Sequence, residues 1–138
     1  MKRVFLLFVI LSLFSACSSD QQKAEKLIHE YLEENLRDLD SYQNIEMGNL
    51  QKISWSDLFI IEDIKKTKNK EQLAIDFDKR LSEFRENIIA KGTNPDSIIA
   101  YSIEHEYRAK NLFGGYIKNH VEYWFDAKIE NIIDVIEK

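Results

Sequence analysis

One segment of the chain repeats apolar residues at intervals of three and four. These apolar positions lie within residues 24–39, and such a stripe is typical of an amphipathic helix that buries one face. Ser19 and Gln22 have the spacing of a capping box just before the stripe. The pattern therefore predicts a helix over about residues 20–38.

A second helical stripe covers residues 73–88. It is followed by the segment KGTNP, residues 91–95, in which a glycine and a proline are typical of a helix end. The basic run KKTKNK, residues 65–70, precedes the stripe. Because it has no interleaved aromatic residues or arginines, we interpret it as a solvated linker or helix face, not as a nucleic-acid patch.

Elsewhere the apolar residues alternate with polar ones, which is the period of a strand. Residues 45–55 predict one strand, broken at Gly48. Alternation returns over residues 99–107 and 117–125, and a last apolar run covers residues 129–136. The C-terminal part of the chain is therefore predicted to form three strands.

The order of these elements is helix, strand, helix and then three strands. Such segregation predicts an α+β fold with helices packed on one face of an antiparallel β-meander. We expect residues 23–138 to form a single domain. A helix on such a meander is similar to the cystatin-like architecture, and this analogy concerns the fold alone.

The last two long strands are predicted to form a hairpin with residues 110–114 as its connection. In this register the apolar side chains of both strands share one face. A slip of one residue would place His105 against His120, and that pair would be a candidate metal site. The predicted opposing pairs are Tyr107 with Ile117, His105 with Asn119 and Glu104 with His120.

The N-terminal residues predict that the chain is exported. Lys2 and Arg3 precede an uncharged run over residues 4–14, and Ser15 and Ala16 are small. This is the order of a signal peptide, and the run is shorter than the roughly 20 residues that span a bilayer. We predict that residues 1–16 are removed.

Cys17, the only cysteine, follows directly in the segment LFSAC. This segment resembles the lipobox of bacterial lipoproteins, although Phe14 stands where the motif usually has leucine, so cleavage by the ordinary signal peptidase stays an alternative. The resemblance implies that Cys17 is lipidated and that residues 17–22 form a tether. With Ser18 next, it further implies the outer membrane of a Gram-negative bacterium.

The net charge limits the partners. Removing residues 1–16 takes two of the 19 basic residues and none of the 24 acidic ones, which leaves a formal charge of −7. A chain of this sign is not suited to nucleic acid as its main partner. A single cysteine also excludes an intramolecular disulfide, so the fold depends on its core.

The hairpin region carries a second resemblance. The segment HEYRAKNLFGGYI, residues 105–117, with its Asn-x-Phe-Gly-Gly-Tyr core, is similar to the strand-turn-strand element of small bacterial envelope lipoproteins of unknown function. The segment ENLRDLDSY, residues 34–42, resembles the helix-to-loop passage of such proteins. The resemblance implies an envelope lipoprotein with a small α+β domain, and it transfers no active site.

No catalytic signature accompanies the histidines. His105 lies among apolar and tyrosine positions, and we expect it to be half-buried and bonded to a tyrosine or an asparagine. His29 and Glu33 are on the polar face of the first helix, where we expect a solvated ion pair. We therefore expect no enzyme, no metal and no cofactor.

The leading hypothesis is a lipid-anchored module that binds another envelope protein or a small ligand, with His105, Asn111, Leu112 and Phe113 as candidate binding residues. A small hydrolase or lyase is one alternative, and it requires His105 to be accessible in a cleft. An inhibitor or immunity-type module is another, and it requires Leu112 and Phe113 to be exposed. Against this last reading, we expect Phe113 to fold back on the sheet.

Overall fold

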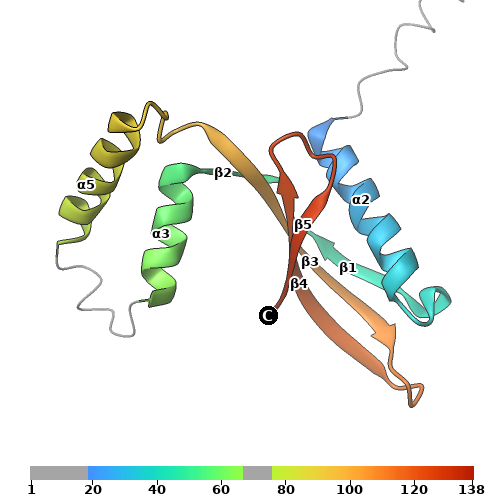
Figure 1. Cartoon of the computed structure of the whole chain (residues 1–138). Coiled ribbons are helices and arrows are strands. Elements are labelled where there is room, and N and C mark those ends of the chain that lie inside the picture. Colours follow the sequence, from blue (N-terminus) through green and yellow to red (C-terminus); the bar gives the residue numbers. More distant parts are fainter. Residues whose placement is uncertain (1–18, 67–75) are drawn as a thin grey trace, which may run out of the picture.

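The computed structural model describes residues 19–66 and 76–138 and contains an antiparallel sheet with helices, which confirms the predicted α+β class (Figure 1). The predicted signal peptide, Cys17 and residues 67–70 of the basic run lie outside the described residues. The helices are α2 (Asp20–Asn35), the 3-10 helix η2 (Leu39–Ser41), α3 (Trp55–Lys66) and α5 (Phe77–Ala90). The strands are β1 (Gln43–Met47), β2 (Gln51–Ser54), β3 (Ile98–Lys110), β4 (Tyr116–Asp126) and β5 (Ile132–Glu137).

The sheet is organised around β3, its longest strand. The strands β3, β4 and β5 form the predicted meander, and β1 and β2 pair with β3 on its other edge. The break between β1 and β2 falls at Gly48, as predicted. A side chain does not fit there, because the backbone nitrogen of Gly48 donates to the Glu104 carbonyl oxygen at 2.8 Å and a Cβ would lie 2.9 Å from that oxygen.

The register of the β3–β4 hairpin differs from the predicted one by two residues. Tyr107 lies opposite Asn119 instead of Ile117, and the connection begins one residue later, after Lys110. The side chains keep their predicted faces because the shift is an even number. The other predicted pairings are replaced in the same way: His105 lies opposite Val121, Glu104 opposite Glu122 and Glu106 opposite His120.

The helix α2 supplies one side of the core. The predicted capping box of Ser19 and Gln22 is confirmed at its start, while the helix ends at Asn35, earlier than predicted. The helix lies over one face of the sheet (Figure 1). Its apolar stripe is part of the core cluster, which contains Ala24, Ile28 and Leu32 of α2 together with Ile103, Val121, Tyr123 and Phe125 of β3 and β4. No helix among residues 19–66 and 76–138 has the length and apolar character needed to cross a bilayer.

The helix α3 begins where a strand was predicted. Trp55 is its first residue, and it follows Ser54, whose hydroxyl accepts from the Asp57 backbone nitrogen at 3.2 Å while the Asp57 carboxylate accepts from the Ser54 backbone nitrogen at 2.8 Å. This reciprocal pair satisfies backbone donors that a helix start leaves free. The prediction of a strand through Trp55 was therefore wrong, because the capping pair and the continuous apolar run after it favour a helix.

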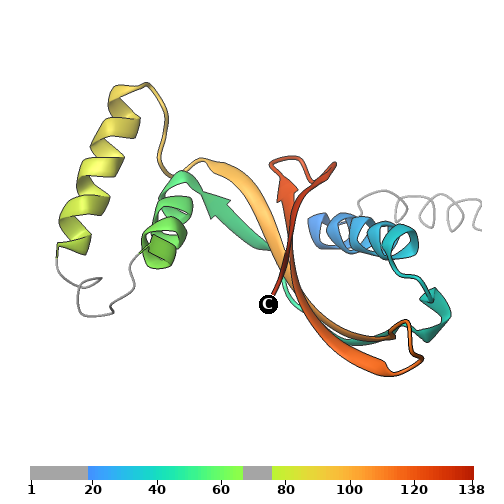
Figure 2. The same cartoon turned by 60° about the horizontal axis from the view of Figure 1, so that its bottom comes forward.

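The helices α3 and α5 pair with each other, away from α2 (Figures 1 and 2). The rings of Phe59 and Phe84 stack with their centroids 4.6 Å apart. Leu58 of α3 also borders a groove with Trp124 on the sheet face opposite α2. The predicted end of α5 is confirmed: the helix stops at Ala90, and Gly92 has a φ of 78°.

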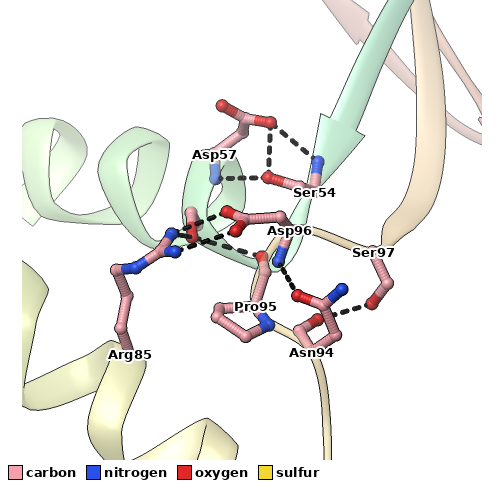
Figure 3. Close-up of polar contacts among 8 residues, drawn as sticks. Ser54, Asp57, Arg85, Asn94, Pro95, Asp96 and Ser97 are labelled. Atoms are coloured by element: carbon pink, nitrogen blue, oxygen red, sulfur yellow. Dashed lines mark hydrogen bonds and ion pairs between the residues drawn. The ribbon is translucent and has the colours of Figure 1, made fainter.

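A polar cluster joins this helix pair to the segment before β3 (Figure 3). The Arg85 guanidinium donates to both carboxylate oxygens of Asp96, at 2.6 and 2.8 Å, and to the Ser56 hydroxyl at 2.7 Å. The Ser56 backbone nitrogen in turn donates to the Pro95 carbonyl oxygen at 3.0 Å. The Arg85 side chain holds the pKa of the Asp96 carboxyl below its ordinary value. The contacts of the Arg85 side chain therefore connect α5 with α3 and with the segment before β3, which is a structural role.

Candidate functional site

The loop between β3 and β4 is organised by Asn111. Its backbone nitrogen donates to the Gly115 carbonyl oxygen at 2.9 Å, and its Oδ1 accepts from the backbone nitrogens of Phe113 and Gly115 at 2.9 and 3.0 Å. Gly114 completes the loop at a φ of 78°. This use of its side chain makes Asn111 a loop-forming residue, and it explains why the hairpin connection starts at this position.

The loop holds apolar side chains in solvent. Phe113 is 93% exposed and Leu112 is 69% exposed, and Tyr116 and Ile117 at the start of β4 are exposed as well. The expectation that Phe113 folds back on the sheet was wrong. The hairpin extends beyond the end of α2 (Figures 1 and 2), so α2 does not cover the loop. We call Leu112, Phe113, Tyr116 and Ile117 the hairpin tip.

Basic side chains surround the hairpin tip. Residues 107–119 contain Arg108, Lys110 and Lys118 and no acidic residue. The Lys110 ammonium lies 5.6 Å from the centroid of the Tyr116 ring, within the range of a cation–π contact. Lys118 forms an ion pair of 2.7 Å with Glu106 at the base of the hairpin. The tip is therefore apolar at its end and positively charged behind it, on a chain that is negative overall.

His105 has a structural role in this architecture. It is fully buried, and its Nε2 lies 3.1 Å from the Tyr42 hydroxyl and 3.2 Å from Asn44 Oδ1. Burial lowers the pKa of His105 to about 4, so the ring is neutral at pH 7. The expected bonding to a tyrosine or an asparagine is confirmed, because the ring contacts both, whereas the expectation of a half-buried ring was wrong. His105 does not meet the condition of the enzyme hypothesis, which required it to be accessible in a cleft.

The other two histidines lie beside carboxylates at the surface. His29 Nδ1 lies 3.1 Å from Glu33 on the exposed side of α2, as expected. His120 Nε2 lies 3.5 Å from Glu104, so the predicted partner is right although the two residues are diagonal and not opposite. Within the ranges that the structure describes, no three His, Cys, Asp or Glu side chains are grouped to hold a metal ion.

The four candidate binding residues do not form one site. His105 is in the core, Asn111 shapes the loop, and Leu112 and Phe113 project from it. The sequence did not reveal a second feature, which is a cavity of about 420 Å³ between the C-terminal half of α2 and the hairpin. It is lined by Tyr31, Asn35, Tyr107, Asn119, Tyr123 and Glu137, among other residues.

Two of these residues left a signal in the sequence. Asn119 and Glu137 occupy positions on strands whose neighbours on the same face are apolar, such as Val121 and Val135. A polar residue at such a position indicates a local opening of the core face. No family model, curated protein or solved structure matches this chain.

Proposed function

We propose that this chain is an envelope lipoprotein that binds another envelope protein through its hairpin tip. Cys17 is its lipid anchor and the outer membrane of a Gram-negative bacterium its location. The exposure of Phe113 carries the proposal, since a phenylalanine that is 93% exposed beside an exposed leucine is costly to maintain without a partner. Such side chains are the usual anchors of protein interfaces.

The position of α2 supports a tip that faces away from the tether. At the start of α2, Gln21 Nε2 donates to the Gly48 carbonyl oxygen at 3.1 Å, near the middle of β3. At its other end, Leu36 and Asn111 line the same cavity, next to the loop. A helix of 16 residues is about 24 Å long. A partner on the side away from the membrane anchor is therefore in reach of the tip.

The charges around the tip define the partner that fits it. Arg108, Lys110 and Lys118 would face acidic side chains, while Leu112 and Phe113 would fill an apolar pocket. Complementary charge steers association and suppresses wrong partners, and the buried apolar anchors supply most of the affinity. We therefore propose a protein partner that carries an apolar pocket with an acidic rim.

Replacing both anchors, as Leu112→Ser with Phe113→Ser, is expected to abolish partner binding and leave the fold intact. Photo-crosslinking in intact cells, from benzoylphenylalanine in place of Phe113, identifies the partner. Titration of the purified partner then measures affinity. We expect Kd to rise about 30-fold or more, because anchor residues contribute about 2 kcal/mol or more.

Ile89→Ser is the matched control, since Ile89 is an exposed apolar residue on α5, far from the tip. It should leave Kd unchanged. Reversal of charge at Arg108, Lys110 and Lys118 should slow association, most at low salt. Crosslinks to lipid alone, or a partner that binds the double variant as tightly as the wild type, would contradict the proposal.

The anchor is tested separately. Cells that express the chain are labelled with radioactive palmitate, and we expect label in the wild type and none in Cys17→Ala. Several acyl chains hold a protein firmly on a membrane, whereas one is marginal, so the wild type should also stay in the membrane fraction when the variant is released. Equal label in both proteins would refute lipidation at Cys17.

A further inference from the structure

The cavity under the C-terminal half of α2 has an aromatic lining. Tyr31 of α2, Tyr107 of β3 and Tyr123 of β4 all border it. The rings of Tyr31 and Tyr123 meet edge to face, with centroids 5.5 Å apart. The cavity volume of about 420 Å³ falls within the range of small-molecule sites. The π faces of tyrosines attract cations.

The charge of the lining is negative. Lys110 borders the cavity, but it lies opposite Tyr116 and its ammonium lies over that ring, on the other face of the sheet. Glu137 shares the cavity face of β5 with Val135. In the described part of the chain the Glu137 carboxylate has no hydrogen bond or ion pair. The lining therefore presents one unopposed carboxylate.

The lining includes free hydrogen-bond acceptors. Asn35 donates one amide hydrogen to the Tyr31 carbonyl oxygen at 2.8 Å, and Asn119 donates one to the Ile117 carbonyl oxygen at 3.3 Å, and the Oδ1 atoms of both side chains remain available as acceptors. Tyr123 is fully buried, and its hydroxyl has no hydrogen-bond partner among the described residues. A buried hydroxyl without a partner is energetically unfavourable.

Burial, together with the neighbouring tyrosines and the Glu137 carboxylate, raises the pKa of Tyr123 above its ordinary value. The hydroxyl is therefore neutral at pH 7, and it is sealed from solvent. The part of the cavity that a ligand can reach thus presents the Tyr31 ring, the Glu137 carboxylate and amide oxygens, while the Lys110 ammonium lies on the other face of the sheet.

We propose that this cavity binds the ammonium group of a small protonated alkylamine. The ammonium lies against Tyr31, the half-buried ring of the lining, and pairs with the Glu137 carboxylate. Its N–H groups donate to the amide oxygens of Asn35 and Asn119. The alkyl chain follows the aliphatic part of the lining. This site borders the hairpin tip at Ile117, but it does not include Leu112 or Phe113 and does not depend on the function proposed for the tip.

Titration with n-hexylammonium chloride, followed by backbone amide NMR shifts, tests the proposal. We expect saturable shifts at residues 31, 121 and 135, with a Kd on the order of 1 mM for a ligand of this size. The neutral analogue 1-hexanol should bind about tenfold more weakly or not at all. Glu137→Gln should raise Kd about threefold, since the ion pair that is removed involves an exposed carboxylate.

Tyr31→Leu removes the ring on which the ammonium lies, and it should raise Kd about twofold to fivefold. Glu130→Gln, an exposed acid in the turn before β5, is the matched control and should leave Kd unchanged. The tip variant Leu112→Ser with Phe113→Ser should also bind hexylammonium normally. Equal binding of 1-hexanol, an unchanged Kd in Glu137→Gln, or no saturable shift at the cavity would overturn the proposal.

Discussion

Ile28→Ala is expected to lower the free energy of unfolding by about 2–5 kcal/mol, the range measured for alanine in place of a large aliphatic core residue. Ile28 is 0% exposed and belongs to the core cluster that joins α2 to the sheet. The substitution removes buried apolar surface and leaves a cavity between α2 and the sheet. Urea unfolding followed by circular dichroism measures the loss.

Ile133→Ala removes the same atoms from an exposed position, since Ile133 on β5 is 57% exposed. We expect this control to change the free energy of unfolding by about 0.5 kcal/mol or less. If the two variants lost the same stability, the docking of α2 on the sheet would not be a main source of stability. Comparison of the two variants thus measures how much the docking of α2 contributes to the free energy of unfolding.

Acidification from pH 7 to pH 4 is expected to remove about 3 kcal/mol of stability through His105 alone. Burial lowers the pKa of His105 from 6.5 to about 4 in the folded chain. Between these values the unfolded chain takes up a proton that the folded chain does not, so stability falls as the pH falls. The groups in contact with the ring, Tyr42, Asn44, Tyr107 and Tyr123, are uncharged over this range.

The variant His105→Gln isolates this effect, because every other titrating group stays in place. The free energy of unfolding is measured at pH 7, 5.5 and 4. From pH 7 to pH 4 it should fall by about 3 kcal/mol less in the variant than in the wild type. His29→Gln, at an exposed position on α2, should keep the wild-type dependence. A wild type and a His105→Gln variant with parallel curves would show that His105 is not held neutral by the fold.

The sequence was sufficient where the signal was local. The stripe that contains Ala24, Ile28 and Leu32 predicted α2, its cap and its buried face, because one helix face records burial directly. The break at Gly48 was also predicted correctly. The helix depends on residues that are close in the chain, and the glycine itself marks the break.

The helix α3 was missed although a local signal was present. Ser54 and Asp57 have the spacing of a capping box, and the apolar residues 58–61 are continuous and do not alternate. A short continuous apolar run suits a buried strand as well as a helix, and the preceding alternation at Ile53 and Trp55 favoured the strand. The capping pair was the evidence that distinguished the two.

The hairpin register depended on the loop and not on the strands. A shift of two residues keeps every side chain on its face, so the apolar pattern does not distinguish the predicted register from the observed one. The hydrogen bonds of the Asn111 side chain decide where the loop starts. The exposure of Phe113 could not be predicted from the apolar pattern either, because it depends on where α2 ends relative to the hairpin.

The cavity could not be predicted, because its parts are distant in the sequence. Tyr31 and Glu137 lie at opposite ends of the described chain and meet only after α2 has docked on the meander. Asn119 was visible as a polar residue on an apolar face, and the predicted register placed it against His105. Because the predicted register and the predicted end of α2 were both wrong, Asn119 could not be assigned to a cavity.

The pairing of α3 with α5 has a consequence for the way the protein opens. In the described parts of the two helices Ser56 is the only buried residue, and α5 has none, whereas β3 and β4 contain most of the core. Little apolar burial means a low free energy for local unfolding. The helix pair is therefore expected to behave as a separate foldon, whose amide hydrogens exchange through partial opening while those of β3 and β4 exchange only when the whole domain unfolds.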